Sequence, residues 1–309
     1  MIDLRQQVID YVALRRSLGF KLRGHDRLLA DFVDYLDRMG ASTVTSQLAL
    51  AWATKPTNVQ PLWRKKRLSV VCGFSRYLHT LDPSVEVPVP DLLAYRYQRP
   101  TPYLYSETEI ASLIDAAGTL SPPLRAMTYQ ALFGLLAVTG MRLSEAIRLD
   151  HDDVDLDAGL IRIRQTKFNK PRQLPLHPTT IAALKEYAQQ RARLGSKPRV
   201  PSFFVSTRGT RLIDACVRRV FAQLIVRVGL QPRAGSGRPR IHDLRHTFAV
   251  ATLRDWYQAG TDVTSKLPLL SAYLGHVDPV STYWYLEAAP DLLVLAAERI
   301  GHARGYCDE

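Results

Sequence analysis

Apolar residues in the first 82 positions recur at helical spacing. The first stripe consists of Leu4, Val8, Tyr11, Val12 and Leu18 and ends at Gly19, and the second consists of Leu28, Leu29, Phe32, Val33 and Leu36 and ends at Gly40. Such spacing places the residues on one helix face, and a glycine after it is a common end signal. Two further helices are predicted over residues 44–53 and 62–81. Residues 1–82 therefore predict a compact bundle of four helices.

A proline-rich segment follows this bundle. Its prolines are Pro83, Pro88, Pro90, Pro100 and Pro102. Because proline lacks a backbone N–H and fixes φ, this density disfavours a helix and stiffens an extended connection. Residues 83–102 are therefore predicted to be a linker, and residues 103–309 a second domain. Ser106 and Glu109 have the spacing of a capping box at its first helix.

The second domain changes its periodicity after a central helix. Residues 122–139 are apolar on nearly every side, which predicts a buried helix that ends at Gly140. Apolar and basic residues then alternate over 160–164, Phe168-Asn169-Lys170 can turn, and residues 172–176 return, as in an antiparallel hairpin. Helical patterns dominate again from Pro178. The chain is thus predicted to be mainly α with a small antiparallel β-sheet, an α+β fold.

Composition narrows the class of protein. The chain has 309 residues and a net charge of +12, which suits a polyanion because each Lys or Arg on a phosphate releases counterions. Charge alone does not decide the matter, because many basic proteins bind no nucleic acid specifically. No apolar run is long enough to span a membrane and no signal peptide is evident, so a cytoplasmic location is expected. Cys72, Cys216 and Cys307 lie too far apart for a metal knuckle and are interpreted as inert thiols.

A basic run opens the fourth predicted helix. It consists of Arg64, Lys65, Lys66 and Arg67 and follows Trp63. One interpretation is a solvated helix end. The other is a DNA-binding stretch along the phosphate backbone, which we favour because no acidic residue occurs between Lys55 and Leu81.

Arg142 lies just after the glycine that ends the central helix. In the segment Thr139-Gly140-Met141-Arg142-Leu143-Ser144-Glu145, Ser144 can hydrogen-bond the first turn of the next helix. Arg142 is therefore expected to project from a rigid corner. Any single arginine at such a place is more often merely an exposed residue at a helix start.

His242 and Arg245 are three residues apart in the segment His242-Asp243-Leu244-Arg245-His246. On a helix they share one face, in the first turn, where free N–H groups and the helix dipole favour an anion. The pair suits a phosphodiester. A zinc site of His242 and His246 is the competing interpretation, but no glutamate follows His242 and no third ligand is evident, so no metal is expected.

The order of these residues along the chain is more specific than any one of them. Arginine, hairpin lysine, His-x-x-Arg, Gly-His and a tyrosine nine residues after that histidine resemble the tyrosine recombinase and phage integrase family. TGMRLSEAIRL is similar to its first motif, HDLRHTFA to its second, and LGHVDPVSTYWYL to its third. The four-helix bundle resembles that family's core-binding domain. The likeness covers almost the whole chain, in a short two-domain form similar to Xer-like and transposable-element recombinases.

The resemblance implies a role for each site residue. Arg142 and Arg245 would hold the scissile phosphate, and Lys167, in the hairpin, would protonate the leaving 5′ oxygen. His242 would act as acid or base, His276 would hydrogen-bond the phosphate, and Tyr285 would attack. Glu145 would orient these groups. Two guanidiniums can hold the charge of a phosphoryl transition state without a metal, and a cationic pocket activates a tyrosine whose pKa is ordinarily about 10.

The implied activity is site-specific cutting and rejoining of double-stranded DNA through a 3′-phosphotyrosyl bond. Strand exchange would proceed through a Holliday junction, with no metal, cofactor or ATP. The expected assembly is a free monomer and a homotetramer on DNA, or a mixed assembly with related recombinases. Two alternatives remain: a type IB-like topoisomerase, and a non-catalytic DNA-binding regulator on the same scaffold. Tyr273 and Tyr283 are the competing nucleophiles, and Lys170 and Arg172 flank Lys167 and are the competing residues for its place in the hairpin.

Overall fold

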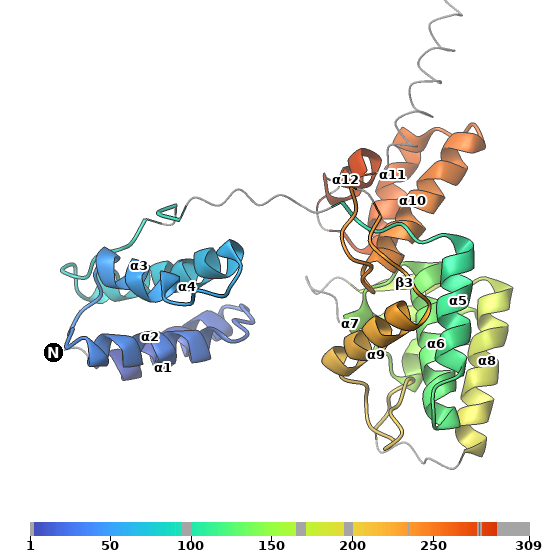
Figure 1. Cartoon of the computed structure of the whole chain (residues 1–309), viewed down its shortest axis with the longest axis horizontal. Helices are drawn as coiled ribbons and strands as arrows, with labels where there is room; N and C mark the ends of the chain where they lie inside the picture. The colour runs from blue at the N-terminus through green and yellow to red at the C-terminus, as the bar shows by residue number, and fades with distance from the viewer. Residues whose placement is uncertain are drawn as a thin grey trace, which may run out of the picture. The chain divides into compact units, whose positions relative to one another are not determined.

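The computed structural model describes residues 3–89, 91–93, 101–164, 171–194, 200–233, 235–276, 278 and 280–288 (Figure 1). The chain divides into two compact units, Met1–Arg99 and Pro100–Glu309. The described residues are mostly helical with one small antiparallel sheet, so the predicted fold class is confirmed. None of the helices in these ranges has both the length and the apolar character needed to cross a membrane.

Four helices form the first unit, as predicted: α1 (Leu4–Ser17), α2 (His25–Arg38), α3 (Ser46–Thr54) and α4 (Pro61–Leu81). Phe32 and Leu36 of α2 are completely buried, as their stripe predicts. The prediction that Leu18 belongs to the first stripe is wrong. Helix α1 ends at Ser17, and Leu18 is 64% exposed where the chain turns at Gly19 with φ +87°.

The second unit begins with two helices that pack on each other. Ser106 and Glu109 form the predicted capping box at the start of α5 (Glu107–Gly118): the Glu109 N–H donates to Ser106 Oγ, and the Ser106 N–H donates to Glu109 Oε2 at 2.8 Å. Helix α6 (Pro123–Thr139) packs against α5, α8 and α10. Its residues Leu132, Phe133 and Leu136 are buried, which confirms the predicted central helix.

A three-stranded sheet follows a short helix, α7 (Leu143–Ala146), and a 3-10 turn, η1 (His151–Asp153). Strand β2 (Leu160–Ile163) pairs antiparallel with β3 (Arg172–Pro175), with Ile161 opposite Leu174, so the predicted hairpin is confirmed. Strand β1 (Val154–Asp155) also pairs with β2 but has two residues, too few for a recognisable pattern. The predicted turn at Phe168-Asn169-Lys170 lies outside the described residues.

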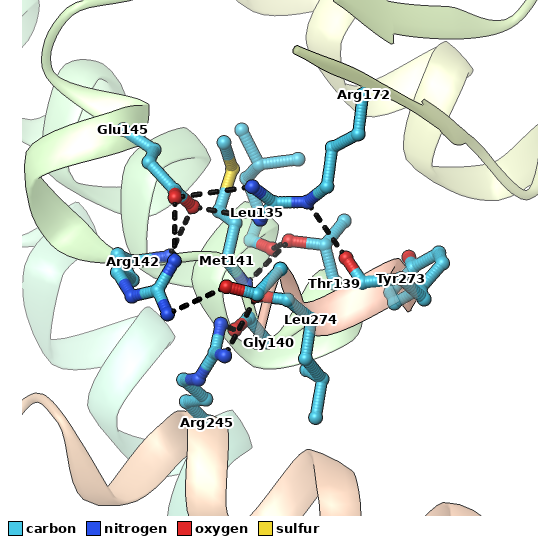
Figure 2. A network of polar contacts seen from close by, with 11 residues as sticks. Leu135, Thr139, Gly140, Met141, Arg142, Glu145, Arg172, Arg245, Tyr273 and Leu274 are labelled. Atoms are coloured by element: carbon cyan, nitrogen blue, oxygen red, sulfur yellow. Dashed lines mark hydrogen bonds and ion pairs between the residues drawn. The ribbon is translucent and has the colours of Figure 1, made fainter. Parts of the chain in front are cut away.

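Five further helices follow in the described part of the second unit: α8 (Pro178–Arg193), α9 (Asp214–Arg227), α10 (Asp243–Gln258), α11 (Val263–Leu274) and α12 (Val280–Ala288). Helices α10, α11 and α12 pack on one another around a buried cluster that includes Leu253, Leu270 and Tyr285. The end of α6, the start of α10 and the end of α11 converge on one region, to which α7 and β3 also contribute (Figure 2).

Candidate active site

The corner after α6 depends on a glycine. Gly140 ends the helix with φ +58°, a backbone conformation that residues other than glycine rarely adopt. A Cβ atom there would lie 2.5 Å from the ring of Phe248. The chain can therefore turn against α10 and bring Arg142 to the start of α7.

Glu145 holds this corner, rather than Ser144 as the sequence suggested. The Arg142 N–H donates to Glu145 Oε2 at 3.0 Å, and Arg142 Nη1 donates to Glu145 Oε1 at 2.9 Å. A carboxylate three residues into a helix can bind both groups, whereas a serine at N2 has too short a reach. Arg142 thus projects from a corner fixed by its own neighbour.

Glu145 also binds a second arginine, Arg172, from the start of β3. Arg172 donates to both carboxylate oxygens of Glu145, at 3.1 and 2.8 Å, so Glu145 lies between two guanidiniums (Figure 2). The carboxylate is 4% exposed. Burial would raise the pKa of Glu145, but the hydrogen bonds and charges of Arg172 and Arg142 outweigh it and lower that pKa. Glu145 is thus an ionised anchor for both arginines.

Arg245 comes from the first turn of α10 and is 3% exposed. Its Nη1 donates to the Gly140 carbonyl at 2.8 Å and its Nη2 to the Leu274 carbonyl at 2.7 Å. Burial lowers the pKa of Arg245 to about 10, against the opposing effect of nearby Tyr285. The guanidinium is therefore still charged at neutral pH.

Three arginines donate hydrogen bonds to consecutive backbone carbonyls at the carboxyl end of α11. Arg172 Nε donates to Tyr273 O at 2.8 Å, Arg245 to Leu274 O, and Arg142 Nη2 to Gly275 O at 2.9 Å. The last carbonyls of a helix lack partners within it, and the negative end of the helix dipole favours cations. These backbone carbonyls thus orient the arginines, and the sequence motifs alone do not predict such contacts.

One pocket of about 200 Å³ collects three of the predicted residues. Arg142, His242 and Arg245 line it, together with Arg218 of α9. His242 is the residue before α10, and its side chain is exposed at the mouth of the pocket although protein surrounds much of the ring. Desolvation by the surrounding protein, followed by the charges of Arg245 and other arginines, lowers the pKa of His242 to about 4. The imidazole is therefore neutral at neutral pH.

Tyr285 lies beside this group on α12 and is 1% exposed. Its ring stacks on His276 with centroids 5.9 Å apart and lies 5.5 Å from the ring of His246. His276 Nδ1 also hydrogen-bonds Thr282 Oγ1 at 2.7 Å. Thr282 and Tyr285 are three residues apart and share one face of α12. That face therefore carries both contacts to His276.

The competing tyrosines have other surroundings. Tyr283 is 47% exposed, and the ring of Tyr273 stacks on Phe248 while its carbonyl binds Arg172. Lys167 lies outside the described residues.

Three of the predicted site residues, Arg142, His242 and Arg245, lie in one pocket, and Tyr285 lies next to Arg245.

The sequence interpretation missed several residues of this region. His246 lies between His242 and Tyr285, with its ring centroid 4.8 Å from that of His242. The four-residue spacing from His242 places both on one helix face, a signal that we interpreted only as the zinc alternative. Among the described residues no three His, Cys, Asp or Glu side chains are grouped for a metal ion. Arg172 was considered only as an alternative to Lys167, and Arg218 had no recognisable local signal.

The basic run of α4 requires one correction. Arg67 is 7% exposed, donates to the Trp52 carbonyl at 3.1 Å and to Asp31 at 3.3 Å, and stacks on the Trp52 ring. It therefore does not face solvent, where a DNA backbone would lie. Arg64 donates to the carbonyls of Pro56 and Thr57, at 3.0 Å each. Lys65 is 3.4 Å from Asp91, and Lys66 is exposed beside the Trp63 ring.

Arg67 is accordingly expected to contribute to stability. Arg67→Met should lower the free energy of unfolding of the first unit by about 1–3 kcal/mol, because the buried Trp52 carbonyl loses its donor. Lys66→Met is the matched control and should change it by less than about 0.5 kcal/mol. Urea unfolding of the full chain, followed by circular dichroism, measures both. Equal stability of the two variants would show that Arg67 has no structural role.

Comparison with known proteins places the chain in a family. A sequence model described as "Phage integrase family" matches residues 104–291. The chain is 42% identical over 308 residues to "Putative integrase/recombinase y4rB" of Sinorhizobium fredii, covering 97% of this chain and 98% of that protein. It is 32% identical over 219 residues to "Tyrosine recombinase XerC" of Azotobacter vinelandii, covering 71% and 67%.

A solved structure has the same fold. The XerH site-specific recombinase bound to a palindromic difH substrate, in a post-cleavage complex, matches with a TM-score of 0.68 and 19% identity. The match covers 91% of this chain and 79% of that one. The family match spans more than half of the chain, and the y4rB relative matches it over nearly its full length. The chain therefore belongs to the phage integrase family and is a tyrosine recombinase.

Proposed function

We propose that this recombinase cleaves and rejoins double-stranded DNA through a 3′-phosphotyrosyl bond to Tyr285. The observation that carries the proposal is the position of Tyr285, which is buried next to Arg245, and Arg245 lines a pocket together with Arg142 and His242. In this reaction the tyrosine oxygen attacks the scissile phosphorus and the 5′ oxygen leaves. The new ester conserves the energy of the broken bond, so rejoining requires no ATP.

Arg142 and Arg245 are proposed to bind the non-bridging oxygens of that phosphate. Each donates to two protein oxygens in the structure. A guanidinium has five N–H groups, so each arginine retains donors for a phosphate. Because protein contacts already orient both guanidiniums, these side chains need to move little as negative charge develops in the transition state. Two such cations can perform the role of a metal ion, so we propose a metal-independent reaction.

His242, which lines the pocket, and His276, which stacks on Tyr285, are proposed to assist the reaction. A neutral His242, with its pKa of about 4, can accept a proton. A bound phosphate adds negative charge to the pocket and raises that pKa, which then favours proton donation. His276, stacked on Tyr285 and fixed by Thr282, is proposed to hydrogen-bond the phosphate.

Lys167 is proposed to protonate the leaving 5′ oxygen. It belongs to the segment between β2 and β3, and Arg172, the first residue of β3, is bound to Glu145 in the site. The chain therefore reaches the active-site region only five residues after Lys167. A lysine is a suitable acid because its pKa decreases readily in a cationic pocket.

Residues 1–82 are proposed to be the core-binding domain, joined to the catalytic domain, residues 103–309, by the linker 83–102. Arg64, Lys65 and Lys66 are proposed to contact the DNA backbone, without Arg67. Recombination of two duplexes needs four cleavages, whereas one chain supplies one nucleophile. We therefore propose a free monomer that assembles as a tetramer of itself, or of itself and related recombinases, and exchanges strands through a Holliday junction.

A covalent-trapping experiment tests this function on DNA that the protein itself selects. Duplexes that bind the full-length Tyr285→Phe variant are selected from a random-sequence library. The selected duplex is then prepared with a nick at each successive position and incubated with the wild-type protein in excess EDTA. A nick a few nucleotides on the 3′ side of the cleavage point lets the short fragment with the released 5′ hydroxyl dissociate, which traps the protein on the 3′ phosphate.

The expected result is a denaturant-resistant protein–DNA adduct at one or a few nick positions. No adduct at any position would leave a DNA-binding regulator, and an adduct that requires Mg²⁺ would contradict the guanidinium mechanism. Intact duplexes distinguish the remaining possibilities. Recombinant products or junctions support recombination, and relaxation of supercoiled DNA alone would indicate a topoisomerase.

A further inference from the structure

Arg218 is a charged residue of the active-site pocket that the proposed mechanism does not use. It lies near the start of α9, and this helix, labelled in Figure 1, contains none of the three family motifs. Its side chain lines the same pocket of about 200 Å³ as Arg142 and Arg245. A third guanidinium therefore borders the space into which a phosphate would enter.

An aspartate one helical turn away binds the Arg218 guanidinium. Arg218 Nε donates to Asp214 Oδ1, and Nη2 donates to Asp214 Oδ2 at 3.2 Å. Both side chains are about half exposed, at 52% and 42%. Exposed pairs of this kind contribute little to stability because water and salt screen them. A phosphate oxygen could thus replace the carboxylate as the partner of Arg218 at low cost.

The neighbouring arginines differ from Arg218 in their attachments. Arg240, before α10, is paired with the buried carboxylate of Asp243. Arg219, next to Arg218 on α9, is exposed and does not line the pocket. Of these three, Arg218 alone combines a place in the pocket with a solvent-accessible partner.

The charge of Arg218 already acts on a pocket residue. Desolvation is the largest cause of the low pKa of His242, and the charges of Arg245, Arg240, Arg142 and Arg218 lower it further. The ring of His246 also faces His242, from the same helix. Arg218 is therefore close enough to influence the electrostatics of the group that handles the proton.

We propose that Arg218 is an additional phosphate-binding residue of the active site, which Asp214 holds until DNA enters and which then binds a DNA phosphate in the pocket. This rests on the proposed function for the identity of the ligand. In the transition state Arg218 would share the developing negative charge with Arg142 and Arg245.

Four variants of the full-length protein test the proposal: Arg218→Ala, Arg218→Lys, Asp214→Asn and, as the matched control, Arg219→Ala. Affinity for the selected duplex is measured from 50 to 200 mM salt, and the cleavage rate is measured on the nicked duplex at saturating protein. Each phosphate contact contributes about 0.9 to the slope of log K against log salt. Both alanine variants remove one positive charge from α9, so they differ in position rather than in net charge.

We expect Arg218→Ala to reduce the salt slope by about 1 and the cleavage rate of bound DNA by roughly 10- to 100-fold. Arg218→Lys should have the salt slope of the wild-type protein but only part of its cleavage rate, because lysine keeps the charge and lacks the planar guanidinium. Asp214→Asn should strengthen binding a few-fold, since Arg218 then has no competing carboxylate. Arg219→Ala should leave the cleavage rate unchanged.

Identical rates and slopes for Arg218→Ala and Arg219→Ala would overturn the proposal, whatever their common value. The binding measurement separates this outcome from failure of the proposed function. If the wild-type protein forms no adduct and Arg218→Ala still loses a phosphate contact that Arg219→Ala keeps, the binding site stands and the phosphotyrosyl mechanism does not. If the wild-type protein forms the adduct and Arg218→Ala behaves as the control, the mechanism stands and the additional site does not.

Discussion

Replacing Tyr285 with phenylalanine is expected to abolish the covalent protein–DNA adduct while leaving DNA binding intact. The substitution removes only the hydroxyl oxygen that we propose as nucleophile. The ring remains to stack on His276 and to pack at a tilt against His246, so the buried packing of α12 is retained. Cleavage of the nicked duplex should fall by on the order of 10⁴-fold or more, as when the nucleophile of a covalent mechanism is removed.

Tyr283→Phe is the matched control for this variant. Tyr283 is on the same helix but is about half exposed, so its hydroxyl can be removed with little effect on the fold. Its cleavage rate should stay within about 3-fold of wild type, as expected for a surface substitution. An adduct of normal yield in Tyr285→Phe, together with its loss in Tyr283→Phe, would transfer the nucleophile to Tyr283.

The site residues predicted from the sequence were those whose order along the chain is distinctive. Arg142, His242 and Arg245 occur in motifs with specific local neighbours, and they lie in one pocket. The glycine that ends α6 was also recognisable, because a left-handed φ at the end of a buried helix favours glycine. Lys167 remains a prediction, since the described residues do not include it.

Contacts between distant segments could not be predicted in this way. Arg172 binds Glu145 and the Tyr273 carbonyl, which are 27 and 101 residues away in the sequence. Nothing in the local pattern around Arg172 specifies either partner. Arg218 is hidden for another reason: with Asp214 four residues earlier it has the pattern of an ordinary surface ion pair.

Arg67 was predictable, but the charge of its neighbours obscured the signal. It precedes Val71, Phe74 and Leu78 by four, seven and eleven residues, and all three are completely buried. This is the spacing of one helix face, so Arg67 belongs to the apolar stripe of α4. Its long side chain reaches the Trp52 ring and carbonyl from that position. Helical position is thus a better guide to its role than membership of a basic run.

Arg142→Lys is expected to reduce the cleavage rate of bound DNA by on the order of 10²-fold or more, with less than about a 10-fold loss of affinity. Lysine keeps the charge, so attraction to the DNA backbone is largely preserved. The planar guanidinium of arginine binds Glu145 and the Gly275 carbonyl and still has N–H donors left for a phosphate. The lysine ammonium lacks this geometry. The loss therefore falls mainly on the transition state, where the geometry of the donors matters most.

Arg245→Lys should reduce the cleavage rate to a similar extent and should also destabilise the fold. Arg245 is buried and donates to two carbonyls, Gly140 O and Leu274 O. One ammonium group is not expected to reach both, and an unpaired buried carbonyl costs about 1–3 kcal/mol. The free energy of unfolding must therefore be measured beside the rate, so that a misfolded fraction is not mistaken for a catalytic defect.

Arg172→Lys distinguishes a phosphate-binding role from a structural one. Arg172 shares Glu145 with Arg142 and is similarly anchored on the end of α11, but it does not line the pocket that Arg142 and Arg245 line. If Arg142 and Arg245 act on the phosphate itself, their Lys variants should lose much more rate than Arg172→Lys at comparable stability. Rapid-quench measurement of cleavage at saturating protein, with affinity measured separately, provides the comparison. If Arg142→Lys instead weakened binding and left the rate on bound DNA intact, Arg142 would be an ordinary backbone contact, and the transition-state charge would have to be stabilised by other groups.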